Sequence, residues 1–272
     1  MASLFSRLTW EGDRLPRIGD VVFDLQALGR PRDVGERGFV LYKEPSYIRV
    51  YADWWPAGFA PRHVLELGLW AGGSAVFWTE LLRPERFVGV DIVKADAIGA
   101  GNLARLQKYQ AEHPEVRLYW QTSQSDRGAL RQLISTECPE GLDLVIDDAS
   151  HMYHPTRISF ETVFPFLRPG GWYVIEDWPW DLGPPSAWQA EWLRAGPPLS
   201  RLISELLLFA GRMPEAMTAF VVRGTFAAVQ RGRAPLQPDF SLLDYLQPPR
   251  IGDLVRMARR LARYALRRGR QR

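Results

Sequence analysis

The chain contains very little cysteine, little lysine and no long apolar run. A single cysteine, Cys138, among 272 residues excludes an intramolecular disulfide and a cysteine-based metal cage. We therefore expect a reduced thiol and a cytoplasmic protein. No run of about 18 apolar residues is present, so the sequence predicts no membrane-spanning helix. The opening stretch, MASLFSRLTWEGDR, breaks its apolar positions with serine, arginine and glutamate, which does not fit a secretory signal peptide.

Positive charge is concentrated at one end of the chain. Residues 250–272 contain nine arginines and one aspartate, whereas the whole chain has a net charge of +3. The remaining residues are therefore net acidic, and the absence of a broad basic groove argues against a nucleic-acid enzyme. The apolar positions of the tail have helical spacing. A basic amphipathic helix of this kind can contact nucleic acid, an anionic membrane surface or a second subunit, or it can pack on its own domain.

Strand patterns and helix patterns alternate from residue 63 onward. Buried-strand patterns such as HVLELG, RFVGVDI and LDLVIDD are each followed by a helical pattern. This alternation predicts βαβ units, and hence an α/β fold with a doubly wound, mostly parallel sheet and helices on both faces. Near the end, TAFVVRGTFAAVQRG reads as two strands joined at Arg-Gly, which predicts an antiparallel pair at the sheet edge.

Three regions are expected along the chain. Residues 1–60 are predicted to form an N-terminal helical cap, with a helix around Ser46 to Trp55. Residues 61–232 form the α/β domain, and residues 233–272 a Pro-rich linker followed by the basic amphipathic helix. Within the domain, residues 178–198 contain four tryptophans and five prolines and interrupt the alternation of strand and helix patterns. Trp178, Trp180, Trp188 and Trp192 either form a lid over the site or fill the core.

A glycine-rich turn lies in VLELGLWAGGSA, residues 64–75, between a strand and a helix. Glycines let the backbone approach a ligand closely, and the helix N-terminus offers free N–H groups. The spacing Gly68-x-x-x-Gly72-Gly73 differs from the G-x-G-x-x-G of dinucleotide sites, and no lysine follows as in a Walker A loop. Glu66 precedes the glycines, where an acid suits a cationic ligand. The alternative is a plain turn whose glycines serve packing.

An acid stands at the end of the next strand. Asp91 follows RFVGV, 23 residues after Gly68. A carboxylate in this place typically accepts hydrogen bonds from ribose hydroxyls. The alternative is a helix N-cap, but beside the glycine-rich turn we favour ribose binding.

Ionisable residues crowd the stretch IDDASHMYH at residues 146–154. Successive strand residues alternate faces, so one of Asp147 and Asp148 can face a site while the other caps the next helix. The following strand ends with Glu176 and Asp177. Because adjacent strands lie about 4.8 Å apart, carboxylates from both ends can converge on one ion. An all-oxygen ligand set favours Mg²⁺, with Mn²⁺ or Ca²⁺ as alternatives.

The ordered set ELGxxxGGS, GVDI, IDDASH and RPGGWYVIED resembles class I S-adenosylmethionine-dependent methyltransferases. More narrowly, it resembles the metal-dependent O-methyltransferases that act on sugars of macrolides and polysaccharides, a group with cephalosporin-hydroxylase-like relatives. The resemblance covers roughly residues 40–230. It implies a Rossmann-like, seven-stranded sheet with a reversed C-terminal hairpin, and transfer of a methyl group from S-adenosylmethionine to a hydroxyl of a sugar or glycosylated natural product.

The resemblance also implies roles for individual residues. The implied cofactor-binding residues are Glu66, Gly68, Gly72, Ser74, Asp91, Ser123, Gln124 and Asp147. The implied metal ligands are Asp148, Glu176 and Asp177. His151, three residues after Asp148, stands where the family carries its general base, and the catalytic pair is His151 with Asp148. The alternative for His151 is a helix-capping or buried histidine. His154 either contacts substrate or orients a ligand, or it is a solvated helix position.

Rival functions remain open at this stage. They are an RNA or other small-molecule methyltransferase without metal dependence, a nucleotide-dependent oxidoreductase, and a non-catalytic binding protein. The missing G-x-G-x-x-G argues against the oxidoreductase, and the crowded like charges argue against an idle site. We expect a small hydroxylated acceptor such as a sugar or glycoside, a homo-oligomer, and no nucleic-acid partner. Peripheral membrane contact through the arginine-rich helix is a further expectation.

Overall fold

A computed structural model describes residues 4–13, 15–25, 38–180, 182 and 196–246. The chain divides into two compact units, Met1–Phe240 and Ser241–Arg272. The predicted basic helix lies outside the described residues, as do Trp188 and Trp192. In the second unit the described part is one short helix, α8 (Leu242–Leu246), where the sequence predicted a linker.

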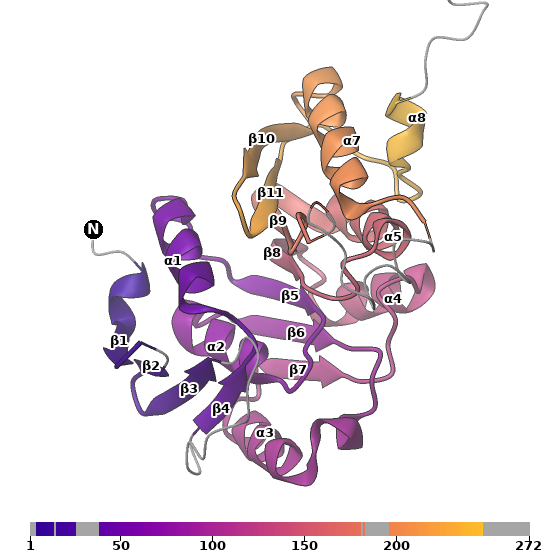
Figure 1. The fold of residues 1–272 in the computed structure, drawn as a ribbon. Coiled ribbons are helices and arrows are strands. Elements are labelled where there is room, and N and C mark those ends of the chain that lie inside the picture. The colour runs from indigo at the N-terminus through magenta and orange to yellow at the C-terminus, as the bar shows by residue number, and fades with distance from the viewer. Residues whose placement is uncertain (1–3, 14, 26–37, 181, 183–195, 247–272) are drawn as a thin grey trace, which may run out of the picture. The chain divides into compact units, whose positions relative to one another are not determined.

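A seven-stranded sheet forms the centre of the first unit (Figure 1). Its strands lie in the order β10-β11-β9-β8-β5-β6-β7. Their bounds are β5 (His63–Leu67), β6 (Arg86–Val90), β7 (Val116–Tyr119), β8 (Leu142–Asp147), β9 (Leu167–Glu176), β10 (Met217–Val222) and β11 (Phe226–Arg231). Strands β5 to β9 are parallel, and β11 is antiparallel to both β9 and β10. The predicted Rossmann-like fold with a reversed C-terminal hairpin is confirmed.

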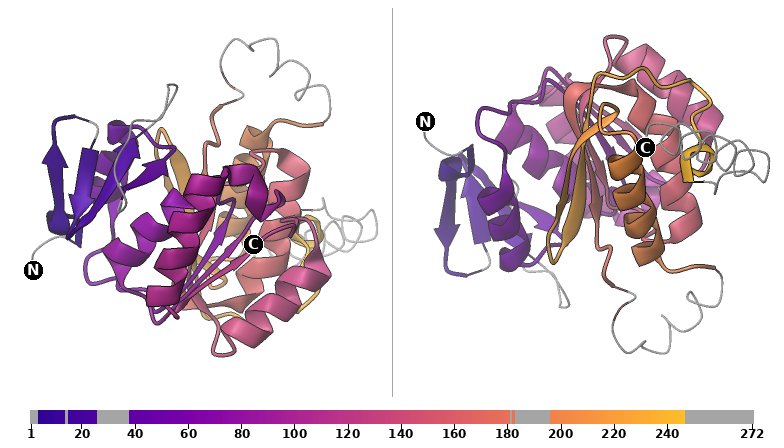
Figure 2. Two further views of the ribbon diagram at one scale, coloured as in Figure 1. Left: turned by 90° about the horizontal axis from the view of Figure 1, so that it is seen from below. Right: turned by 90° about the horizontal axis from the view of Figure 1, so that it is seen from above.

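Helices cover both faces of this sheet (Figure 2). Helices α2 and α3 lie on one face, and α4, α5 and α7 on the other. Their bounds are α2 (Gly73–Leu82), α3 (Ala100–Glu112), α4 (Arg127–Glu137), α5 (Tyr153–Val163) and α7 (Leu199–Arg212). All five residues of β5 are buried, as expected for a central strand covered on both sides.

A second sheet of four strands precedes the domain, so the prediction of a helical cap over residues 1–60 is wrong. Its strands, in the order β1-β2-β3-β4, are β1 (Leu8–Glu11), β2 (Leu15–Ile18), β3 (Val21–Leu25) and β4 (Gly38–Leu41). Among the described residues of this region, the predicted helix is present as α1 (Pro45–Trp54). No helix lies between β1, β2 and β3 within the described residues, so the alternation of strand and helix patterns that marked the domain is missing here. The predicted boundaries after residues 60 and 232 stay predictions.

Helix α2 lies between the two sheets, which explains why it is apolar all round. Every residue of α2 except Glu80 is buried. Phe77 of α2 packs edge-on against Phe23 of β3, with ring centroids 5.3 Å apart. At the start of α2, a Cβ atom on Gly73 would lie 1.9 Å from the carbonyl oxygen of Val40 in β4. Only glycine therefore allows β4 to pack on this turn.

The strand order reverses between β5 and β8, which are neighbours in the sheet although β6 and β7 come between them in sequence. In open α/β sheets, ligands bind at such a switch point, beyond the carboxyl ends of the strands. The fold thus places the glycine-rich turn after β5 and the acids after β8 at the edge where a ligand is expected. No helix within the described ranges is both long enough and apolar enough to span a membrane.

Replacing Gly73 with alanine is expected to destabilise the protein by about 3 kcal/mol or more, because the new methyl group forces β4 off α2. The matched control is Gly101→Ala in α3, where an added Cβ meets no atom within 4 Å. That variant should be neutral or stabilised by up to about 1 kcal/mol. Thermal unfolding followed by circular dichroism measures both, and equal melting temperatures for the two variants would contradict the packing described.

Candidate active site

A cavity of about 350 Å³ opens at the carboxyl ends of β5, β6 and β8. Its size suits a small organic ligand, for which pockets of about 300–1,000 Å³ are usual. Part of its wall comes from Tyr42 and Lys43, in the segment between β4 and α1. Five of the predicted cofactor-binding residues line it: Gly68, Ser74, Asp91, Ser123 and Gln124.

Gly68 is the point where three strand ends meet. Its φ of +90° lies in the left-handed region, and a Cβ there would be 2.2 Å from the carbonyl oxygen of Asp148. Its N–H donates to the carbonyl of Val90 at 2.9 Å, and the N–H of Asp148 donates to the carbonyl of Leu67 at 2.8 Å. A residue with a side chain would push β8 away from β5 and open the floor of the cavity.

Asp91 holds the glycine-rich turn against β6. One carboxylate oxygen accepts hydrogen bonds from the N–H groups of Leu69 and Trp70 at 2.7 and 2.8 Å. The other oxygen accepts from the N–H of Val93 at 2.9 Å. A carboxylate can accept about four hydrogen bonds, so one position remains for a ligand. Asp91 therefore shapes the turn as well as facing the cavity.

Asp147 does not face the cavity, contrary to its predicted contact with a cofactor. It is buried, and its carboxylate contacts the hydroxyls of Ser159 and Tyr173 at 2.6 and 2.7 Å and the amide of Gln124 at 3.1 Å. Burial raises the pKa of Asp147 to about 6, against the lowering effect of those hydroxyls. Gln124 reaches further with its amide oxygen, which accepts from the N–H of Ser150 at 2.9 Å. Asp147 and Gln124 together fix the loop after β8.

Two other predicted cofactor contacts, Glu66 and Gly72, lie behind the cavity wall. Gly72 faces the side chain of Leu106. Glu66 is fully buried, and neither oxygen makes a hydrogen bond within the described residues. Burial raises the pKa of Glu66 well above its ordinary value, while nearby Lys43 and Ser74 lower it. Burial therefore favours the uncharged form of Glu66, the acid that lies next to Ser74.

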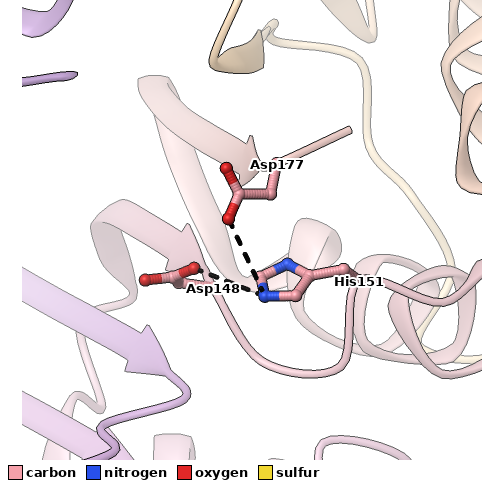
Figure 3. A group of neighbouring side chains, drawn as sticks. All are labelled: Asp148, His151 and Asp177. Atoms are coloured by element: carbon pink, nitrogen blue, oxygen red, sulfur yellow. Dashed lines mark ion pairs between the residues drawn. The ribbon is translucent and has the colours of Figure 1, made fainter. Parts of the chain in front are cut away.

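Beside the cavity, the predicted catalytic histidine meets two predicted metal ligands. Asp148, His151 and Asp177 point toward one another from the loop after β8 and the end of β9 (Figure 3). The Nε2 atom of His151 lies 3.8 Å from Oδ1 of Asp148 and 4.0 Å from Oδ2 of Asp177. One donor atom from each residue lies within 4.8 Å of the others, a spacing that a bound metal ion can bridge.

The backbone of this group is strained. His151 has a φ of +53° and Asp177 a φ of +51°, in the left-handed region that non-glycine residues seldom adopt. Neighbouring groups hold both residues there. The indole N–H of Trp180 donates to the carbonyl of His151 at 2.6 Å, and the N–H of Asp177 donates to the carbonyl of Thr225 at 2.8 Å. Such strain is typical of functional sites.

Glu176, the third predicted metal ligand, is engaged elsewhere. One of its oxygens contacts the ammonium of Lys43, and the other accepts a hydrogen bond from the hydroxyl of Tyr51 at 2.6 Å. The Lys43 ammonium also donates to Oδ2 of Asp148 at 3.0 Å. Burial and the Asp148 carboxylate raise the pKa of Glu176 to about 8, and Lys43 opposes them. The structure does not bring Glu176 into the group of Asp148, His151 and Asp177.

Helix α1 supplies side chains whose contacts with the acids of the site the sequence did not predict. Tyr51 contacts Glu176, and the hydroxyl of Tyr47 lies 2.5 Å from Oδ1 of Asp177. Lys43 precedes the helix with the same spacing of four residues. The sequence signal for these three residues is the pattern K-x-x-x-Y-x-x-x-Y. Its spacing of four places three polar groups on one side of the start of a helix.

The central part of the chain matches a known family. Residues 65–178 match a family model described as a methyltransferase domain. This match, together with the fold, confirms the resemblance to class I methyltransferases that the sequence predicted.

Curated relatives and solved structures share parts of the chain. Mycinamicin VI 2''-O-methyltransferase of Micromonospora griseorubida is 30% identical over 161 residues, which cover 57% of this chain and 36% of that protein. L-olivosyl-oleandolide 3-O-methyltransferase of Streptomyces antibioticus is 42% identical over 155 residues, covering 49% and 36%. A structure of a methyltransferase from the mycinamycin biosynthetic pathway with Mg, SAH and mycinamycin VI has a TM-score of 0.47 at 28% identity, covering 70% and 49%. The matched region thus spans about a third of these curated relatives' length.

Replacing Asp91 with asparagine should destabilise the protein by roughly 1–3 kcal/mol, because an amide group then faces backbone N–H donors. Asp96→Asn, at an exposed position a few residues on, is the control and should leave stability unchanged. Urea unfolding of both variants measures the difference. An Asp91→Asn protein as stable as the control would show that the three backbone hydrogen bonds do not hold the turn.

Proposed function

We propose that this chain, whose residues 65–178 match a methyltransferase domain, transfers a methyl group from S-adenosylmethionine to a hydroxyl of a sugar or glycosylated natural product with the help of a divalent metal ion. The observation that carries the proposal is the convergence of Asp148, His151 and Asp177 beside the cavity at the switch point of the sheet. The names of the relatives, which are O-methyltransferases of glycosylated macrolides and polyketides, support the acceptor class.

The cavity fits S-adenosylmethionine. Asp91 keeps one acceptor position for a ribose hydroxyl, and Ser123 lies at the same wall. The turn at Gly68 lets the backbone approach the ligand, and Ser74 at the start of α2 lines the same cavity. When bound, this cofactor supplies an electrophilic methyl group on a sulfonium.

The donor set also fits a divalent cation. Asp148 and Asp177 each direct a carboxylate oxygen toward the same point, and oxygen ligands favour Mg²⁺ or Mn²⁺. A cation held there would lower the pKa of an acceptor hydroxyl as a Lewis acid. Because Mg²⁺ binds imidazole poorly, His151 is left free to exchange a proton.

His151 stands where a proton acceptor is needed. It lines a second cavity of about 110 Å³, and Met152 and Pro155 line both cavities. An acceptor bound in this second cavity would lie beside the imidazole and next to the cofactor cavity. His151 would accept the hydroxyl proton of the acceptor when the methyl group is transferred from the cofactor. Trp180 fixes the backbone of His151, so the imidazole is oriented before the acceptor arrives.

Other expectations from the sequence remain proposals. We propose a homo-oligomer, a lid formed by residues 178–198, and contact of the basic tail with an anionic membrane surface rather than with nucleic acid. A methyltransferase without metal dependence is the alternative function, and it would stay active after divalent metal is removed.

His151→Ala is expected to lower kcat about 10²- to 10⁴-fold, because the general base is lost, while affinity for S-adenosylmethionine stays unchanged. His113→Ala, at the end of α3 and outside the lining of both cavities, is the matched control and should keep full activity. Turnover of a macrolide glycoside and calorimetric binding of the cofactor give the two readouts. Normal turnover in His151→Ala would remove His151 from this role.

Removing divalent metal with EDTA should abolish methyl transfer and leave cofactor binding intact, because the cation and the cofactor use different residues. Adding Mg²⁺ or Mn²⁺ should restore activity, and Asp177→Asn should require higher metal concentrations for restoration. Activity that persists in EDTA would favour the metal-independent alternative.

A further inference from the structure

Lys43 lies between two parts of the acidic cluster, an inner half formed by Glu176 and an outer half formed by Asp148, His151 and Asp177. Its ammonium contacts Glu176 and donates to Oδ2 of Asp148, and its side chain is only 3% exposed. The side chain of Glu176 is 1% exposed, whereas those of Asp148, His151 and Asp177 are 22%, 30% and 45% exposed. The inner half is closed by protein groups, and the outer half is open to solvent and to ligands.

Both oxygens of Glu176 are held by cationic or donor groups. Lys43 contacts one oxygen and the hydroxyl of Tyr51 the other. A divalent cation on Glu176 would share a carboxylate with the Lys43 ammonium, and two positive charges that close repel strongly in a buried setting. Asp148 is different, because Oδ2 meets Lys43 while Oδ1 faces His151.

We infer that Lys43 is a built-in cation that neutralises Glu176 and fixes Asp148, so that a divalent metal is held by Asp148 and Asp177 without Glu176. Lys43 is then a positioning residue. It holds Oδ2 of Asp148 by a hydrogen bond and leaves Oδ1 of Asp148 available to the metal. Tyr47 completes the arrangement, since its ring lies 5.0 Å from the Lys43 ammonium and its hydroxyl 2.5 Å from Oδ1 of Asp177. The inference rests on the proposed metal-assisted function and refines its ligand set.

Isotope-edited infrared difference spectroscopy tests the ligand set without relying on activity. One sample of wild-type protein carries ¹³C in the side-chain carboxylates of glutamate, and another in those of aspartate. On addition of Mg²⁺, the carboxylate bands of aspartate should shift and those of glutamate should not. A glutamate band that shifts in wild-type protein and is absent from Glu176→Gln would overturn the inference.

Metal affinity provides the second readout, measured as free Mn²⁺ by electron paramagnetic resonance. Asp177→Asn should raise the Kd at least about tenfold, and Glu176→Gln should change it much less. Glu85→Gln, which removes an exposed acid paired with Arg62, is the control and should match wild type. Equal weakening by Glu176→Gln and Asp177→Asn would count against the inference.

Lys43→Gln tests the positioning role. Without the ammonium, Glu176 is free to turn toward the metal, so a glutamate band should now shift on addition of Mg²⁺. No such band in folded Lys43→Gln protein would show that Lys43 is not what keeps Glu176 away. Should this variant fail to fold, the wild-type spectra still decide the ligand set.

The outcomes separate this inference from the proposed function. A glutamate band in wild type removes only the role of Lys43 and leaves a metal-assisted enzyme. Wild-type protein that binds no Mn²⁺ and shows no aspartate shift removes metal assistance and the inference together. Cofactor binding, measured by calorimetry, is independent of both.

Discussion

The carboxylates of Asp148, Glu176 and Asp177 gather at the ends of the neighbouring strands β8 and β9 and repel one another, and the rest of the site compensates this repulsion. Lys43 neutralises the most buried of those at the strand ends, Glu176, and ties down one oxygen of Asp148. Tyr47 holds Asp177 from the side of α1. The compensation is incomplete toward solvent, because Oδ1 of Asp148 and Oδ2 of Asp177 contact neither Lys43 nor Tyr47 and face only the imidazole of His151 among the described residues. Binding of an external cation therefore relieves a repulsion that the fold has built in.

The seven-stranded domain could be predicted from the sequence because its signals are local. An apolar run such as HVLEL, followed at once by glycines and a helical pattern, specifies strand, turn and helix within about twenty residues. Asp91, Asp148, His151 and Asp177 could be placed because each stands at or just after such a strand end, and parallel strands all end at one edge of the sheet.

The remainder depends on contacts between distant residues, which no local pattern records. Lys43 and Glu176 are 133 positions apart, so the residues next to either one do not indicate that the two form a pair. Which of Asp147 and Asp148 faces the cavity depends on where β8 leaves the sheet, and Asp147 turned inward to Ser159 and Tyr173. The four short N-terminal strands were missed because their stability comes from packing on α2 rather than from their own pattern.

The close approach of β4 to Gly73 has a consequence for the order of assembly. During synthesis the N-terminal strands leave the ribosome first, yet the surface they pack on is made later, and the partners of Lys43 later still. Lys43 meets Asp148 and Glu176 only after more than a hundred further residues have been added. Contacts between residues so far apart in sequence form slowly, so we expect these contacts to form late in folding. The group that we propose to bind the metal is then complete only when residues before α1 have met the ends of β8 and β9.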